Sequence, residues 1–181
     1  MDNIHRHFRW NNDPELNRLD SEFPYEEESF GAFKSRFEQM CDNPSPSHRN
    51  FEIHALDDDE TLIGVAYATR ISAHNLHAQL GITIGDRDYW GRGYGRSSFR
   101  LLLSFCFEHL GLHRVCAETF EYHTAWRDLV EGMGFKKEGT VREYLRRDGT
   151  YWDKEIYGLL EQEYRARRPE SGERAPVEMA A

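Results

Sequence analysis

Three glycines alternate at Gly91, Gly93 and Gly95, directly before the apolar run of residues 99–110. A glycine-rich turn that leads into a helix presents main-chain N–H groups at the positive end of the helix dipole, which suits a phosphate. Glycine lets the main chain approach a pyrophosphate closely and adopt conformations that a side chain forbids. The stretch therefore predicts a phosphate-binding turn, with a purely structural tight turn as the alternative.

Polar side chains in this turn and just after it would add charge and hydrogen bonds at its rim. They are Arg92, Arg96, Ser97 and Ser98. The spacing excludes two other kinds of phosphate site. A GxxxxGK[ST] nucleotide loop needs a lysine that is missing here, and the dinucleotide fingerprint needs GxGxxG inside a parallel βαβ unit, whereas this stretch reads GxGxG.

Acidic residues are concentrated near the start of the chain. The net charge is -9, and residues 1–60 hold 15 Asp and Glu against 6 Lys and Arg, so the other 121 residues carry 17 of each and balance. A chain of this charge repels nucleic acid, so we expect no nucleic-acid partner. The acidic runs at residues 26–28 and 57–59 either form a solvated surface or attract a cationic substrate.

The sequence shows no sign of a membrane span or a metal site. No window approaches the roughly 18 apolar residues of a spanning helix, and the first residues have no apolar signal core. Cys41, Cys106 and Cys116 lack CxxC spacing, and the nine histidines form no metal-ligand pattern. We therefore expect a cytoplasmic protein with no membrane partner and no metal.

Helical and strand patterns alternate along the chain. Apolar residues recur at helical spacing over residues 30–40, and a helix there must end before Asn43-Pro44. Residues 48–56, 61–71 and 76–84 are rich in β-branched and apolar residues and predict an antiparallel meander.

The second half predicts two more helices and three more strands. One helix covers residues 99–110 and ends at Gly111, a strand follows at residues 113–120, and a further helix ends at Gly134. Asp148-Gly149 separates two apolar-aromatic runs within residues 135–160, which predicts a hairpin. We expect a single α+β domain over residues 1–164, with one mixed, mostly antiparallel sheet flanked by helices, and a disordered tail at residues 165–181.

Five motifs occur in a fixed order along residues 10–160. They are LGITI (80–84), YWGRGYG (89–95), GMGF (132–135), EGTVRE (138–143) and DGTYWDKEIYGLL (148–160). Together they resemble the GNAT superfamily of acyl-CoA N-acetyltransferases, in particular the branch of ribosomal-protein N-terminal and spermidine acetyltransferases. Only nine residues precede the segment that begins at Trp10, so we expect the opening strand and helix of that family to be shortened or missing here.

The resemblance implies a place for acetyl-CoA. The acyl-CoA motif of the family falls on Trp90, Gly93 and Gly95, and Trp90 departs from the usual Gln or Arg at its first position. The main chain of the preceding strand would pair with the pantetheine arm. The resemblance thus assigns cofactor binding to Ile82, Thr83, Ile84, Trp90, Gly91, Arg92, Gly93, Tyr94, Gly95, Arg96 and Ser97.

Acetyl transfer to an amine needs a base for the amine proton and is helped by an acid for the departing thiolate. We expect the base to be Glu118 or His123, with a solvent-facing position for Glu118 and a capping or CoA-contact role for His123 as alternatives. Many relatives carry a tyrosine acid at the position of Val130. Tyr122, Tyr144 or solvent would have to replace it.

The resemblance implies an acetyl-CoA-dependent N-acetyltransferase that acts by direct transfer to a primary amine. The acidic first 60 residues favour a cationic acceptor, such as a polyamine, an aminoglycoside-like amine or a protein N-terminus. The alternative is a non-catalytic acyl-CoA sensor or assembly module, which Val130 and the shortened opening favour. A shortened sheet edge would also suit a homodimer.

Overall fold

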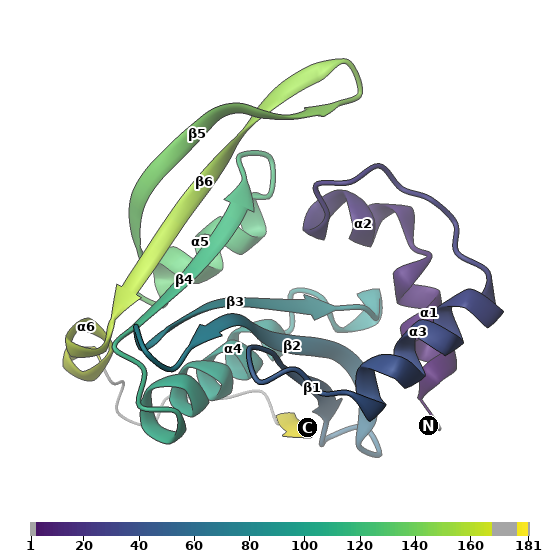
Figure 1. Ribbon diagram of the computed structural model, residues 1–181, viewed down its shortest axis with the longest axis horizontal. Helices are drawn as coiled ribbons and strands as arrows, with labels where there is room; N and C mark the ends of the chain where they lie inside the picture. The colour runs from purple at the N-terminus through teal and green to yellow at the C-terminus, as the bar shows by residue number, and fades with distance from the viewer. Residues whose placement is uncertain (1–2, 168–176, 181) are drawn as a thin grey trace.

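The computed structural model describes residues 3–167 and 177–180 (Figure 1). They form the expected α+β fold around one mixed sheet with the strand order β5-β6-β4-β3-β2-β1-β7. Every neighbouring pair is antiparallel except β3 with β4. The strands are β1 (Arg49–Ala55), β2 (Thr61–Ser72), β3 (His77–Ile84), β4 (Arg114–Phe120), β5 (Lys136–Arg147), β6 (Thr150–Leu160) and β7 (Val177–Ala180).

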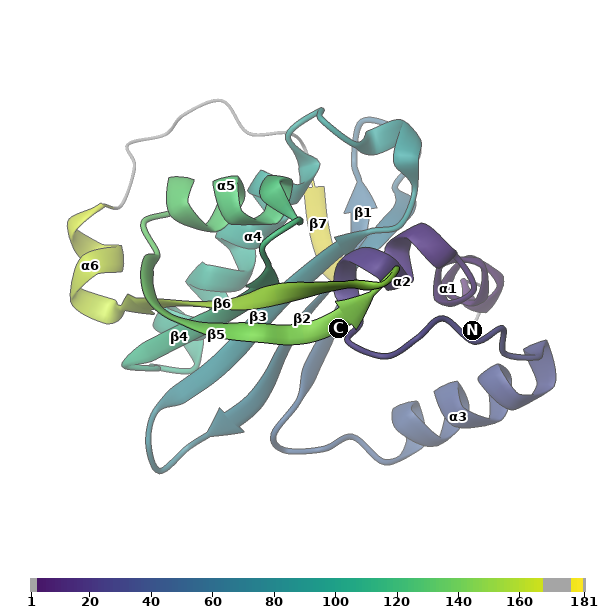
Figure 2. The same ribbon diagram turned by 90° about the horizontal axis from the view of Figure 1, so that it is seen from above.

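The helices are distributed on both sides of this sheet. Figure 2 shows α4 and α5 on one side and α3 on the other. Within the described part of the chain, no helix is long and apolar enough to cross a bilayer. The helices are α1 (Ile4–Asn11), α2 (Pro14–Asp20), α3 (Phe30–Asp42), α4 (Tyr94–Ser104), α5 (Thr124–Gly132) and α6 (Glu161–Ala166), with a 3-10 turn at Arg87–Tyr89 and a π-helical turn at Phe105–His109.

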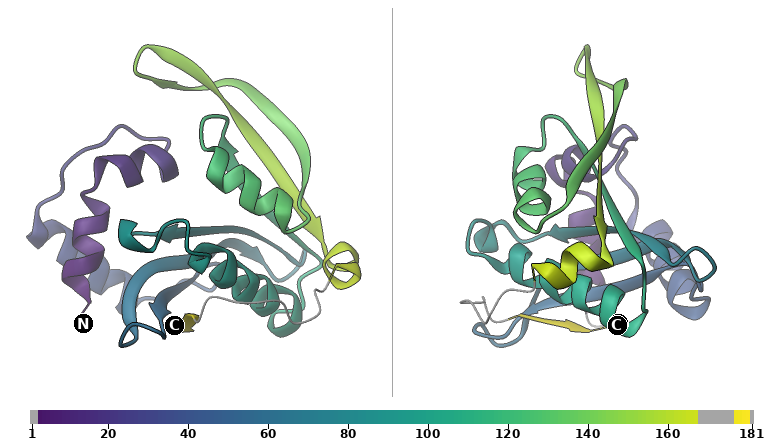
Figure 3. Two further views of the ribbon diagram at one scale, coloured as in Figure 1. Left: turned by 180° about the vertical axis from the view of Figure 1, so that it is seen from behind. Right: turned by 90° about the vertical axis from the view of Figure 1, so that its left-hand side faces the viewer.

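The core lies between the sheet and the helices α4 and α5. Figure 3 shows from behind how these two helices lie along the sheet. Phe99 and Leu102 of α4, Val115 of β4 and Val130 of α5 are all 0% exposed. Each such side chain contributes about 1.5–3 kcal/mol by leaving water, so this packing fixes α4 and α5 against the sheet.

The turn between β5 and β6 has the predicted form. Asp148 and Gly149 have φ values of 52° and 80°, and Arg147 pairs with Thr150 across the turn. Two central residues with positive φ match the twist of a tight hairpin. The two strands project from the sheet as a long hairpin (Figure 1).

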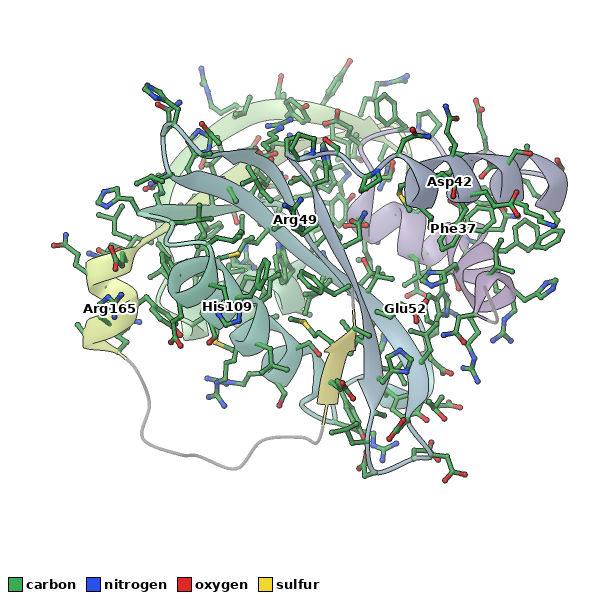
Figure 4. All side chains as sticks on the ribbon, turned by 60° about the horizontal axis from the view of Figure 1, so that its bottom comes forward. Phe37, Asp42, Arg49, Glu52, His109 and Arg165 are labelled. Atoms are coloured by element: carbon green, nitrogen blue, oxygen red, sulfur yellow. The ribbon has the colours of Figure 1, made fainter. Side chains whose placement is uncertain are left out.

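The helices α1 and α2 were not expected from the periodicity of the sequence. The α2 helix begins at a recognisable signal, because the Asp13 side chain accepts hydrogen bonds from Glu15 N and Leu16 N and Pro14 follows it. His7 of α1 lies 2.7 Å from Glu52 of β1 and against Phe37 of α3. These contacts attach the N-terminal helices to the sheet, and Figure 4 shows Glu52 and Phe37 at this end of the molecule.

Residues 3–48 contain three helices and no strand, so β1 is the first strand of the described chain. Its outer edge is covered by β7, with Ile53 paired to Met179. Within the segment expected to be disordered, residues 165 and 166 end α6 and residues 177–180 form β7. An open strand edge offers unpaired main-chain groups to a short extended segment such as β7. Residues 168–176 and 181 lie outside the described residues. The open edge that suggested a homodimer is filled by the same chain.

Candidate active site

The strands β3 and β4 separate after a short parallel contact. They are paired only from His77 with Arg114 to Gln79 with Cys116. Beyond that point β3 stays paired with β2 as far as Ile84, while β4 turns away with β6 (Figure 1). A fork between two strand edges results, with main-chain groups of β3 facing it.

A cavity of about 250 Å³ lies at this fork. Gly81 and Ile82 of β3 form one wall, and Thr119 and Phe120 of β4 form the other. Trp126 of α5 closes one side, and its Nε1 donates to the Glu118 carbonyl at 3.0 Å. The cavity is therefore a product of the strand separation, and side chains from other elements surround it.

The glycine stretch forms a turn with left-handed residues. Gly91 and Gly93 have φ values of 71° and 88°, and Gly93 is the N-cap of α4. No side chain caps this end, and the first turn of α4 contains no acidic residue. The first N–H groups of a helix have no partner within it, so this end of α4 suits an anion.

The turn and the cavity meet at β3. Ile82 lines the cavity, and its Cδ1 would lie 3.4 Å from a Cβ placed on Gly95. Trp90, the unusual first residue of the turn motif, donates from Nε1 to the Ile84 carbonyl at 2.7 Å. Its indole thus joins the turn to the end of β3, a contact that an Arg or Gln side chain also has the donors to make.

Several polar side chains of the turn point into the protein rather than to the rim. Tyr94 is 2% exposed and its hydroxyl donates to Asp57 at 2.7 Å. Ser97 and Ser98 are also buried, which differs from the rim role expected for their hydroxyls, because they lie on the helix face that packs on the core. Any contact of Tyr94 or Ser97 with a cofactor must therefore involve the main chain, and Ser97 N already donates to Gly93 O.

The two arginines of the stretch differ in placement. Arg92 lies over the rings of Tyr89 and Tyr94, with its guanidinium carbon 5.4 and 5.5 Å from their centroids. Arg96 is exposed and lines a second cavity of about 460 Å³, together with Met133 after α5 and Arg167 after α6. Arg96 is therefore the arginine better placed to meet a ligand.

Both predicted candidates for the base line the cavity at the fork. Glu118 is engaged by cations, since its carboxylate lies 2.8 Å from Lys154 Nζ and 3.9 Å from Arg70. His123 occupies the N-cap position of α5 but makes no side-chain capping bond, so the capping alternative is wrong. Burial lowers the pKa of His123, which favours the neutral ring.

The tyrosines considered as acids hold the N-terminal segment against the hairpin. Tyr122 donates to the Arg18 carbonyl at 2.6 Å, and Tyr144 donates to Glu22 at 2.5 Å. Arg147 adds a bond to the Ser21 carbonyl at 2.8 Å. We name this contact of Tyr122, Tyr144 and Arg147 with residues 18–22 the hairpin latch. Because both tyrosine hydroxyls donate within it, neither tyrosine is positioned to replace the acid that is missing at Val130.

One polar residue of the cavity was missed by sequence reasoning. Asp20, at the end of α2, accepts from Tyr67 at 2.8 Å and from Thr83 at 3.4 Å. No local motif marks it, because its position depends on how α2 packs above β2 and β3.

The cavity carries a small excess of negative charge. Three carboxylates and two cations line it, giving a formal charge of -1: Asp20, Glu22 and Glu118 against Arg70 and Lys154. The acidic run at residues 57–59 does not contribute, since Asp57 and Asp58 bind the hydroxyls of Tyr94 and Tyr89 instead. In the described part of the chain, no His, Cys, Asp and Glu side chains are grouped as a metal site.

Comparison with known proteins gives consistent results. The chain matches the acetyltransferase (GNAT) domain family over residues 2–136. It is 31% identical over 114 residues to the uncharacterized N-acetyltransferase p20 of Bacillus licheniformis, covering 63% of each chain. It is 28% identical over 103 residues to the ribosomal protein uS5-alanine N-acetyltransferase of Escherichia coli strain K12, covering 56% of this chain and 53% of that protein. The chain thus spans less than two thirds of these relatives.

The fold is also found among solved structures. The spermidine N-acetyltransferase from Vibrio cholerae, in complex with CoA and spermine, aligns with a TM-score of 0.80 and 23% identity, covering 90% of this chain and 92% of that one. At this identity the likeness shows the fold, and the domain match shows the family.

Proposed function

Because the chain belongs to the acetyltransferase (GNAT) family, we propose that it is an acetyl-CoA-dependent N-acetyltransferase that acylates a primary amine by direct transfer. The observation that carries this proposal is the cavity at the fork of β3 and β4, next to an uncapped glycine turn. A thioester and an amine can meet there without a covalent enzyme intermediate. Holding two reactants together in this way supplies much of the rate acceleration.

In this proposal the glycine turn binds the pyrophosphate of acetyl-CoA. The N–H groups at the start of α4 and the left-handed Gly91 and Gly93 leave room for a close main-chain approach. The edge of β3 at Ile82 and Thr83 runs along the fork and would hold the acyl arm. A main-chain N–H on this edge is the natural donor to the oxyanion of the tetrahedral adduct.

The acceptor is proposed to be a cationic primary amine that enters the cavity. The formal charge of -1 at the fork favours an ammonium over an anion. Relatives and neighbours of this chain include a uS5-alanine and a spermidine N-acetyltransferase. The substrates of these two proteins support an amine acceptor, either a small polyamine or a protein N-terminus.

The proposal is tested by mixing the purified protein with acetyl-CoA and a panel of amines that includes spermidine and an alanine-initiated peptide. Thiol release is followed, and products are identified by mass. Each amine is paired with its fully N-acetylated form, which has no free amine to react. We expect thiol release only with the free amine and a product heavier by one acetyl group.

Two outcomes would contradict the proposal. Calorimetric binding of acetyl-CoA without turnover of any amine would favour the non-catalytic acyl-CoA-binding module. An absence of acetyl-CoA binding would leave the glycine stretch as a structural turn.

A further inference from the structure

Asp20 brings a carboxylate to the fork from outside the sheet. The hydroxyl of Tyr67 donates to Asp20 Oδ1 at 2.8 Å, and Thr83 Oγ1 donates to Oδ2 at 3.4 Å. Asp20 also lines the cavity, and part of the residue is exposed to solvent. The carboxylate is therefore oriented by two neutral donors and stays accessible to a molecule in the cavity.

The position of Tyr67 depends on a glycine in the next strand. Tyr67 of β2 pairs with Gly81 of β3, and a Cβ on Gly81 would lie 2.3 to 2.4 Å from atoms of the Tyr67 side chain. The tyrosine ring thus occupies the space above Gly81. Side chains alternate along a strand, so Gly81 and Thr83 share the face of β3 opposite to Ile82, which contacts α4. Tyr67, Thr83 and Asp20 are gathered on that face.

The other carboxylates of the cavity have cationic partners. Glu118 lies 2.8 Å from Lys154, and Glu22 lies 3.5 Å from the same ammonium. Proton uptake by either one would break an ion pair with Lys154, whereas proton uptake by Asp20 would not. His123 lies between β4 and α5 in the chain, and its ring is hydrogen-bonded to the main chain of Leu19, the residue before Asp20. Asp20 is the carboxylate that bonds to β3 itself.

We propose that Asp20 is the general base that takes the proton from the acceptor amine, an inference that rests on the proposed N-acetyltransferase function. The nitrogen forms a bond to the thioester carbonyl carbon, and the C–S bond breaks with its electron pair leaving on sulfur. A primary ammonium loses two protons on becoming an amide N–H. One passes to Asp20 and then to solvent, and the other converts the thiolate to the thiol.

The surroundings of Asp20 suit this role. The protein around the Asp20 carboxylate keeps water away from it, and this desolvation raises the pKa of Asp20 above its ordinary value. The hydrogen bonds from Tyr67 and Thr83 lower that pKa in part. A raised pKa makes a carboxylate a stronger base toward an amine. The other ionisable side chains lining the cavity are Glu22 after α2, Tyr67 and Arg70 on β2, Glu118 on β4, His123 before α5 and Lys154 on β6.

The test compares the wild type with Asp20→Asn in the amine assay. The amide keeps an acceptor for Tyr67 but cannot take a proton. We expect kcat to fall about 100-fold or more, a typical contribution of a general base, while the Kd of acetyl-CoA from calorimetry stays within about twofold. Glu15→Gln, the same change of charge on α2 at an exposed ion pair with Arg87, is the matched control and should retain wild-type kcat.

A second variant reports on the titration of Asp20. Tyr67→Phe removes a hydrogen bond that lowers the pKa of Asp20, so that pKa should rise further. The base must be deprotonated to work, and the acid limb of the kcat profile should therefore move to higher pH than in the wild type. Tyr67 acts here as a positioning residue, and a merely structural role would lower kcat without moving the limb.

The outcomes separate this inference from the proposed function. Turnover by the wild type with an Asp20→Asn kcat within about threefold, or an acid limb that stays in place in Tyr67→Phe, would overturn the role of Asp20 and leave the acetyltransferase standing. A wild type that binds acetyl-CoA but acetylates no amine would overturn the proposed function and, with it, this inference. A melting temperature for Asp20→Asn equal to that of the wild type confirms that the variant is folded.

Discussion

The glycine turn at residues 91–95 is made of main chain from one continuous stretch, whereas the cavity at the fork takes side chains from six separate elements, α2, β2, β3, β4, α5 and β6. The turn depends on left-handed φ angles and an uncapped helix end. The cavity depends on how far β4 diverges and where α2 rests. The part of the proposed site that binds the cofactor is therefore formed by residues adjacent in the sequence. The part that binds the acceptor is formed by residues that only the tertiary structure brings together. Mutations should separate the two halves.

The largest expected effect lies in the turn. Gly93→Glu should raise the Kd of acetyl-CoA by about 100-fold or more, because two unit charges about 4 Å apart near a surface repel by about 4 kcal/mol. Titration calorimetry with acetyl-CoA measures the change. Gly93→Ala carries the same left-handed strain at φ 88° without the charge and is the control.

If Gly93→Ala weakens binding as much as Gly93→Glu, then strain rather than charge governs this site. The proposed contact between the turn and a pyrophosphate would then be wrong.

On the acceptor side, Gly81→Ala should lower kcat about tenfold while leaving the Kd of acetyl-CoA nearly unchanged. The added Cβ would lie 2.3 Å from the Tyr67 side chain, so the ring must move away from Asp20. Overpacking of this kind also costs about 1–3 kcal/mol of stability, which chemical denaturation would measure. Steady-state kinetics with a fixed amine gives kcat.

Gly139→Ala is the matched control, since a Cβ at Gly139 on β5 meets nothing within 4 Å. Equal kinetic effects of the two alanine variants would show that the Tyr67 position does not matter for the reaction.

A smaller effect is expected from disrupting the hairpin latch, and it should change only the binding of the acceptor amine. Arg147→Ala removes hydrogen bonds to the carbonyls of Arg18 and Ser21, so the segment that carries Glu22 should loosen over the cavity. We expect KM for the amine to rise about fivefold, in line with the 0.5–1.5 kcal/mol of a typical hydrogen bond, with the Kd of acetyl-CoA unchanged.

The exposed neighbour Arg146 provides the control variant Arg146→Ala, which should leave KM unchanged. A rise in the Kd of acetyl-CoA in Arg147→Ala would contradict the separation of the two halves.

The smallest effect is expected at Arg96, whose guanidinium is exposed beside the second cavity. Arg96→Gln should weaken acetyl-CoA about two- to fivefold at low salt and less at high salt, as expected for an exposed charge contact of up to about 1 kcal/mol. Calorimetry with acetyl-CoA and with its analogue lacking the 3′-phosphate measures it. Equal losses for both ligands would place the contact at the pyrophosphate rather than at the 3′-phosphate.

The sequence predicted the elements that depend on local patterns. The turn residues Asp148 and Gly149, the strands of the meander and the helix stops at Gly111 and Gly134 all follow from the conformations that short stretches prefer. The α2 helix has an N-cap signal at Asp13-Pro14. Neither α1 nor α2 was predicted, because both are too short to show a clear helical repeat of apolar residues. The strand β7 is four residues long. It forms because its main chain pairs with the open edge of β1.

The amino-acid sequence by itself determined the α+β class, the order of the helices α3, α4 and α5 and of the strands β1 to β6, and the glycine turn, because local patterns in the chain mark each of these. The tertiary structure alone decided that Tyr94 and Ser97 face the core, that Glu118 is held by Lys154, and that Asp20 accepts a hydrogen bond from Tyr67. Side-chain partners of this kind lie tens of residues apart. Their contacts depend on how helices pack on the sheet, which no local spacing specifies.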